Sequence, residues 1–175
     1  MDRSYINGVL LTESKTHPET GKPFTNAERI QHSLMGIVTE LGELTDIFKR
    51  HIYYGKDIDK EHLVEELGDL FWYLALGFEI TSASVPEDNR LTITNPVCAI
   101  MTGLESITAF TRPFDVRIKQ VYKMAWQVAT LQGLDYEDIL VKNLAKLRKR
   151  YGDSFDADRA INRDVAAEYE AMRDA

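Results

Sequence analysis

The sequence predicts an all-α fold, an antiparallel helical bundle with a four-helix core. Three observations lead to this class. Apolar residues recur every three or four positions over long stretches, and Gly, Pro and Asn residues separate these stretches. No convincing run of alternating apolar and polar residues predicts a strand, and residues 91–94 (LTIT) are the one weak candidate. The length of 175 residues fits a single domain that covers 1–175.

The N-terminal half predicts a lead-in followed by two long helices. The lead-in, residues 1–29, is expected to be irregular because it contains Gly8, Pro18, Gly21 and Pro23. A first helix starts at Asn26, a residue type that caps helices, and runs to about His51. Its apolar stripe consists of Ile30, Leu34, Ile37, Leu41, Leu44 and Phe48. After a break at 54–57, a second helix runs from about Asp59 to about Ile80, with a stripe of Leu63, Leu67, Leu70, Leu74 and Gly77.

The C-terminal half predicts a loop and further helices. Residues 81–96 contain two prolines and several Ser, Thr and Asn residues, which is typical of loops. A third helix covers about 97–110, and Pro113 suits the first turn of a fourth helix that ends before Gly133. Asp135 can cap a fifth helix over 136–150, which Gly152 can close. The tail from Ala157 has a helical composition.

Composition narrows the function. The chain has 21 basic and 28 acidic residues, a formal charge of −7, which argues against non-specific binding to a nucleic acid polymer. The single cysteine, Cys98, excludes an intrachain disulfide framework and a Cys-rich zinc site. No run of 18 apolar residues predicts a membrane span, and the start of the chain lacks the apolar core of a secretory signal. We therefore expect a cytoplasmic protein without a membrane partner.

Two pairs of acids indicate a metal site. On helical geometry, Glu40 lies about 80° from the centre of the first apolar stripe, with Glu43 one turn further along the same flank. Glu66 lies only about 40° from the centre of the second stripe, and Asp69 follows on the same side. A buried carboxylate has to be paired or bind a metal, and oxygen ligands suit Mg²⁺ or Mn²⁺. The same acids are also compatible with a solvated surface, the usual role of a charge run.

Other sites of similar chemistry lack their motifs. No Glu-x-x-His, Gly-x-Ser-x-Gly or Gly-x-Gly-x-x-Gly sequence is present. Neither Gly-Lys pair is followed by Ser or Thr, so a P-loop is excluded. Residues 142–151 (KNLAKLRKRY) hold five bases and no acid. This segment is either a helix end with favourable positive charge or a phosphate clamp that faces the carboxylates.

The spacing of the two acid pairs resembles that of a known protein family. Glu40-x-x-Glu43, then 22 residues, then Glu66-x-x-Asp69 resembles the signature of the MazG-like all-α nucleoside triphosphate pyrophosphohydrolases. The surrounding sequence GIVTELGELTDIFKRHIYYGKDIDKEHLVEELGDLFWYLA is similar to that family, and NLAKLRKRYGDSFDADRAINRD is similar to the C-terminal motif of its short, single-copy, phage-type members. The resemblance covers residues 30–80 and 140–164.

The resemblance implies divalent-metal-dependent hydrolysis of a nucleoside triphosphate to its monophosphate and pyrophosphate, with Mg²⁺ as cofactor and Mn²⁺ as a substitute. It implies that Glu40, Glu43, Glu66 and Asp69 are the catalytic metal ligands, with Glu43 a candidate general base. The C-terminal segment 140–175 would form the phosphate side. The implied substrate-binding residues are Tyr73, Asn143, Lys146, Arg150, Tyr151, Asn162 and Arg163.

The resemblance further implies a homodimer or a homotetramer, in which the C-terminal segment can serve a neighbour's site. A cytoplasmic location, that of the host for a phage-encoded chain, follows from the same members. Deoxynucleoside triphosphates are the expected substrates, with dGTP first and dUTP or dCTP next. Pool control, nucleotide diversion and sanitation all stay open as roles. The alternative function is a non-catalytic helical bundle that binds a nucleotide or another protein.

Overall fold

The computed structural model describes residues 1–87, 89 and 92–175, and this part of the chain is all-helical, as predicted. Its helices are α1 (Arg3–Thr12), α2 (Asn26–Tyr54), α3 (Lys60–Thr81), α4 (Pro96–Thr108), α5 (Phe114–Leu131), α6 (Tyr136–Tyr151), α7 (Ala157–Ile161) and α8 (Val165–Arg173). Within the described ranges the β structure is limited to one isolated bridge, between Thr16 and Pro23. The strand candidate is not a strand at 92–94, and Leu91 lies outside the described residues.

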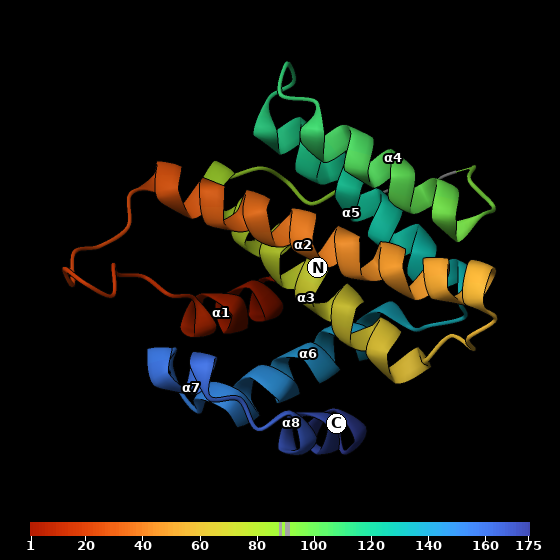
Figure 1. The fold of residues 1–175 in the computed structure, drawn as a ribbon. Coiled ribbons are helices and arrows are strands. Elements are labelled where there is room, and N and C mark those ends of the chain that lie inside the picture. The colour runs from red at the N-terminus through yellow and green to blue at the C-terminus, as the bar shows by residue number, and fades with distance from the viewer. Residues whose placement is uncertain (88, 90–91) are drawn as a thin grey trace.

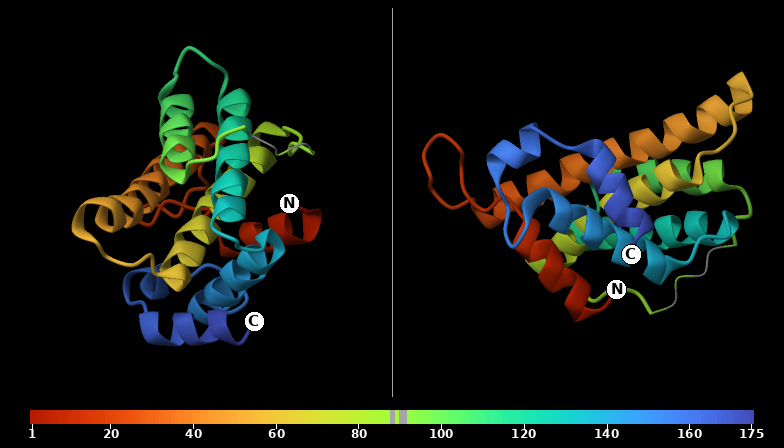
Figure 2. Two further views of the ribbon diagram at one scale, coloured as in Figure 1. Left: turned by 90° about the vertical axis from the view of Figure 1, so that its right-hand side faces the viewer. Right: turned by 90° about the horizontal axis from the view of Figure 1, so that it is seen from below.

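The helices stack in layers around α2 and α3 (Figure 1). These two long helices pack against each other, and the α4–α5 hairpin covers them on one side. Helices α1 and α6 cover α3 on the other side, and α8 packs on the outside of α6 (Figure 2). Helix α3 is therefore the most enclosed element of the fold. Fourteen of its residues are buried, from Leu63 to Phe78.

Local signals fix the ends of the two central helices. The Thr25 side chain accepts a hydrogen bond from the Glu28 amide, and the Glu28 side chain binds the Thr25 amide in return, which forms a capping box at the start of α2. Gly55, with a φ of 67°, ends α2 in the left-handed conformation that glycine adopts most easily. Asp59 caps α3 through the amides of Glu61 and His62. These boundaries lie within about three residues of the predicted ones.

The prediction of an irregular lead-in over 1–29 is wrong for residues 3–12, which form α1. Asp2 caps this helix through the Tyr5 amide, and Tyr5, Ile6 and Val9 bury an apolar stripe. Gly8 is no helix breaker here. A Cβ atom at Gly8 would lie 2.7 Å from Leu144 Cδ2, so glycine is what allows α1 and α6 to approach so closely.

The non-helical residues between α1 and α2 are tied back to the core. The Glu13 carboxylate, only 2% exposed, accepts two hydrogen bonds from Arg29 of α2, at 2.5 Å from Nε and 2.8 Å from Nη2. Such a bidentate pair holds its partners in one geometry. It fixes the start of the connecting loop against α2.

Two glycines of α2 should respond in opposite ways to substitution by alanine. A Cβ atom at Gly36 would lie 2.2 Å from Tyr73 Cε1, whereas one at Gly42 would meet nothing within 4 Å. We expect Gly36→Ala to lower the free energy of unfolding by about 1–3 kcal/mol through overpacking. We expect Gly42→Ala to raise it by about 0.5–1 kcal/mol through helix propensity. Thermal unfolding of the two variants tests this, and equal stability at both positions would contradict the packing.

Candidate functional site

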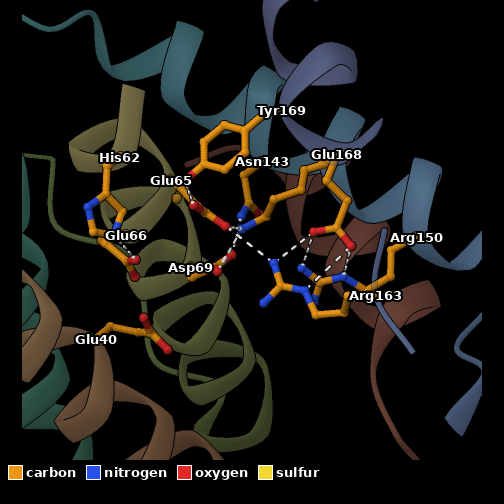
Figure 3. Close-up of polar contacts among 12 residues, drawn as sticks. Glu40, His62, Glu65, Glu66, Asp69, Asn143, Arg150, Arg163, Glu168 and Tyr169 are labelled. Atoms are coloured by element: carbon orange, nitrogen blue, oxygen red, sulfur yellow. Dashed lines mark hydrogen bonds and ion pairs between the residues drawn. The ribbon is translucent and has the colours of Figure 1, made fainter. Parts of the chain in front are cut away.

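Three of the four predicted carboxylates meet between α2 and α3 (Figure 3). Oxygen atoms of Glu40, Glu66 and Asp69 all lie within 4.8 Å of one another. Glu66 is 9% exposed, as expected for an acid beside an apolar stripe. Glu43, one turn further along α2, is exposed and is not part of this group. The structure therefore brings together one acid of the first pair and both acids of the second.

The protonation of the cluster reflects its excess of negative charge. Burial, the charge of Asp69 and a hydrogen bond with Glu66 raise the pKa of Glu40 to about 9. Burial also raises the pKa of Glu66, and Asp69 and Glu65 add to that effect. His62 lies on the other side of Glu66, with Nε2 2.8 Å from Oε1. Glu40 therefore keeps a proton at neutral pH unless a cation replaces it.

Helix α6 supplies a polar face that holds Asp69. Lys146 is 0% exposed, and its Nζ donates to Asp69 Oδ2 at 2.6 Å and to Glu65 Oε1 at 3.4 Å. Asn143 Nδ2 donates to Asp69 Oδ1 at 2.8 Å. The close approach depends on Gly68, where a Cβ atom would lie 2.9 Å from Asn143 Cβ. Lys146 and Asn143 thus position a carboxylate of the cluster rather than project from the surface.

A second ionic group joins α6 to α8. The Glu168 carboxylate accepts hydrogen bonds from Arg150, at 2.7 Å from Nε and 2.6 Å from Nη2, and from Arg163 Nη2 at 2.7 Å. In Figure 3 the Arg163 guanidinium lies between Glu168 and Glu65, and its Nη2 also donates to Glu65 Oε1 at 3.3 Å. Burial alone would raise the pKa of Glu65, but Lys146, a hydrogen bond from Tyr169 and Arg163 hold it below its usual value.

A cleft of about 270 Å³ opens beside the acids. Glu40, Asp69 and Arg150 line one part of it, so carboxylates and a guanidinium face the same space. Its volume is slightly below the usual range for ligand pockets. The remaining wall is largely aromatic and consists of His32, Trp72, Tyr73, Tyr151 and Phe155, together with smaller side chains.

The aromatic wall is rigid because its rings contact one another. The centroids of Trp72 and Tyr73 are 4.9 Å apart, and His32 packs edge-on against both, at 5.9 and 5.5 Å. Tyr151 and Phe155 form a second ring pair at 5.2 Å. Burial lowers the pKa of His32, so its imidazole is neutral at pH 7. This wall can hold a flat, uncharged ring system.

The implied substrate-binding residues fall into two groups. Tyr73, Arg150 and Tyr151 line the cleft, and Asn143, Lys146 and Arg163 belong to the ionic network behind it. Asn162 joins neither group. It is exposed, ends α7, and donates through Nδ2 to Asp158 Oδ1 at 3.0 Å. Its position is explained by capping a short helix.

Several residues of the site escaped the sequence analysis. His32 and Gly36 precede Glu40 by eight and four residues, a helical spacing that could have identified them. Tyr5 could have been found from the Asp2 cap and the stripe that follows it. No sequence signal distinguishes Glu65 or Glu168 from surface acids, because only the packing of α6 and α8 buries them.

Comparisons of the chain with models of known protein families, with curated proteins and with solved structures found no match. Of the helices in the described part of the chain, none has the length and apolar character required to span a membrane.

Glu40→Gln should stabilise the metal-free protein at alkaline pH. The pKa of Glu40 is about 9 in the folded chain against 4.5 for an unperturbed glutamate, so the folded state binds the extra proton between these values. The contribution of Glu40 to the free energy of unfolding therefore falls as the pH rises from 4.5 to about 9. Glutamine cannot lose a proton. We expect a gain on the order of 1 kcal/mol, about 2–4 °C in Tm, at pH 8 in EDTA, and little change at pH 5.

Glu43→Gln is the matched control, because Glu43 sits one turn away on the same helix and is exposed. Thermal unfolding at both pH values should leave this variant within about 0.5 kcal/mol of the unsubstituted chain. If Glu40→Gln lowers Tm at pH 8, the raised pKa of Glu40 is wrong.

Proposed function

We propose that this chain is a divalent-metal-dependent nucleoside triphosphate pyrophosphohydrolase that converts a deoxynucleoside triphosphate to its monophosphate and pyrophosphate. The observation that carries the proposal is the convergence of Glu40, Glu66 and Asp69, two of which, Glu40 and Asp69, line a cleft whose other wall is aromatic. One end of this cleft suits a metal-bound polyphosphate, and the other suits a nucleobase. The resemblance of the two acid pairs and the C-terminal motif to the MazG-like family supports the same activity.

The residues present fit a divalent cation. All three clustered ligands are carboxylates, the donor type that Mg²⁺ and Mn²⁺ prefer. The proton that Glu40 retains indicates a site short of positive charge, and a cation would displace that proton. Glu40, Glu66 and Asp69 would hold the ion. When bound, it would neutralise charge on the triphosphate and lower the pKa of a water molecule.

The chain's own groups supply the remaining chemistry. Water attacks the α-phosphorus, the bond from that phosphorus to the oxygen bridging to the β-phosphorus breaks, and pyrophosphate leaves. A carboxylate takes the proton of the attacking water. Glu43, about 4.5 Å further along the α2 axis than Glu40, is the candidate on the solvent side. Arg150 faces the cleft and would neutralise charge on the leaving pyrophosphate.

The aromatic wall supports binding of a nucleoside by stacking. His32, Trp72 and Tyr73 form a rigid, uncharged surface beside the acids. The order of preference, dGTP before dUTP or dCTP, rests on the resemblance to short phage-type members. A cytoplasmic location rests on that resemblance as well.

The oligomeric state belongs to the proposal too. We expect an antiparallel four-helix core built from α2, α3, α4 and α5, and a homodimer or homotetramer of such units. Support for assembly comes from apolar side chains of α2 that expose more than half of their surface, namely Met35, Ile52, Tyr53 and Tyr54.

The proposed activity predicts its products. The chain is incubated with the eight common NTPs and dNTPs and with dUTP, in Mg²⁺, Mn²⁺ or EDTA, and pyrophosphate is measured separately from orthophosphate. We expect monophosphate and pyrophosphate in equal amounts, with no turnover in EDTA. Folded protein without turnover in any metal would favour the alternative, a non-catalytic bundle. Orthophosphate with a diphosphate would place the attack at another phosphorus.

Asp69→Asn should lower kcat/KM by about 100-fold or more. Residues that only support metal ligands contribute 10- to 100-fold, so loss of a ligand's charge should exceed that. Asp46→Asn is the matched control, because Asp46 lies on α2 outside the cluster and pairs with Lys49 and Arg50. Its kcat/KM should stay within about twofold. Full activity of Asp69→Asn would exclude the assigned site.

A further inference from the structure

Helix α1 places a hydroxyl group at each end of the candidate site. Tyr5, in its first turn, reaches the network around Asp69. Thr12, its last residue, reaches the aromatic wall of the cleft. Both residues are nearly inaccessible, at 3% and 6% exposure. The geometry of each contact indicates what the hydroxyl does.

The Tyr5 hydroxyl and the Asp69 carboxylate together hold the Asn143 amide in one orientation. The Tyr5 hydroxyl donates to Asn143 Oδ1 at 2.9 Å, and the Gly68 carbonyl oxygen lies further away, at 3.4 Å. Asn143 Nδ2 in turn donates to Asp69 Oδ1 at 2.8 Å. An amide turned by 180° would set its carbonyl oxygen against the Asp69 carboxylate and would lose the hydrogen bond that the Tyr5 hydroxyl donates. Burial and the charge of Asp69 hold the pKa of Tyr5 well above its usual value, so the hydroxyl stays a donor.

The Thr12 hydroxyl fixes the indole of Trp72. Its oxygen accepts a hydrogen bond from Trp72 Nε1 at 2.9 Å. The hydroxyl can donate to the Val9 carbonyl at 3.1 Å or to the Gly8 carbonyl at 3.4 Å. Because backbone carbonyls of its own helix take the proton, the Thr12 oxygen is left to accept from the indole. Trp72 in turn packs edge-on against His32 and Tyr73.

We propose that α1 is the positioning element of the site: Tyr5 orients Asn143 toward Asp69, and Thr12 orients Trp72 in the cleft wall. The inference rests on the proposed function, because it takes Asp69 as a metal ligand and Trp72 as part of the nucleoside surface. The two ends of α1 act on different parts of the substrate complex. Removing one hydroxyl should therefore affect metal binding, and removing the other should affect nucleoside binding.

Tyr5→Phe tests the first end. Mn²⁺ binding is followed by the electron paramagnetic resonance signal of the free ion, which requires no turnover. We expect about 10-fold weaker binding, the lower end of the effect of residues that support metal ligands, because Tyr5 acts on Asp69 through Asn143. In an Asn143→Ala background the same substitution should have no further effect, because Tyr5 acts through Asn143. Tyr122→Phe is the matched control, since it removes a buried tyrosine hydroxyl that bonds to Tyr136 and to the Met1 amino group and touches neither Asn143 nor the clustered acids.

Thr12→Val tests the second end. This variant should bind Mn²⁺ as the unsubstituted chain does, while KM for the best deoxynucleoside triphosphate rises about 10-fold and kcat changes less than twofold. The indole N–H signal of Trp72 should shift in a proton–nitrogen correlation spectrum, with Trp126→Phe identifying it. Thr81→Val is the matched control, because the Thr81 hydroxyl bonds within its own helix, to the Gly77 and Phe78 carbonyls.

The outcomes separate this inference from the proposed function. Unchanged Mn²⁺ affinity in Tyr5→Phe, or unchanged KM in Thr12→Val, overturns the role of that residue while leaving the activity intact. Equal weakening of both properties by both variants overturns the separation of the two ends. An unsubstituted chain that neither binds Mn²⁺ nor hydrolyses any triphosphate overturns the proposed function, and the inference falls with it.

Discussion

Carboxylates removed from water on α3 impose the strongest constraint on this structure. Glu65, Glu66 and Asp69 lie within two turns of the most enclosed helix, and Glu40 of α2 faces them. An uncompensated charge in such a place is strongly destabilising. Two features reduce this charge. Lys146 is buried against Asp69 and Glu65, and Glu40 keeps a proton. The packing of α6 on α3 is therefore an electrostatic requirement as well as an apolar contact.

The ionic network that joins α3, α6 and α8 contains as many bases as acids, so the unneutralised negative charge of the site lies outside this network. Glu65, Asp69 and Glu168 are matched by three bases, which are Lys146, Arg150 and Arg163. Glu168 is almost fully buried, so α8 has to stay docked for the two arginines to remain paired. What remains is the pair Glu40 and Glu66, with His62 as the one neighbouring base among the described residues. The divalent cation of the proposed function would neutralise this pair.

The cleft combines two surfaces of different chemistry because two layers of the fold meet at it. Helices α2 and α3 contribute the acids and the rings of His32, Trp72 and Tyr73, while α6 and the segment after it contribute Arg150, Tyr151 and Phe155. Helix α1 runs beneath both and is bonded to each. The proposed substrate, a polyphosphate with an attached base, would use the charged end and the aromatic end of the cleft together.

The sequence by itself determined the helical class, the approximate bounds of α2 to α6, and the four acids worth testing, because caps, breakers and apolar periodicity act locally. It also singled out Lys146, Arg150 and Tyr151. Only the tertiary structure decided that Glu43 stays exposed while Glu65 is buried. In the sequence both are acids within a predicted helix, and it is the packing of α6 on α3 that buries Glu65. The same holds for Lys146, whose partners are 77 and 81 residues away along the chain. Helix α1 was determined in part by each. Its cap and apolar stripe are visible in the sequence, but the close approach of Gly8 to Leu144 depends on the packing of α1 on α6.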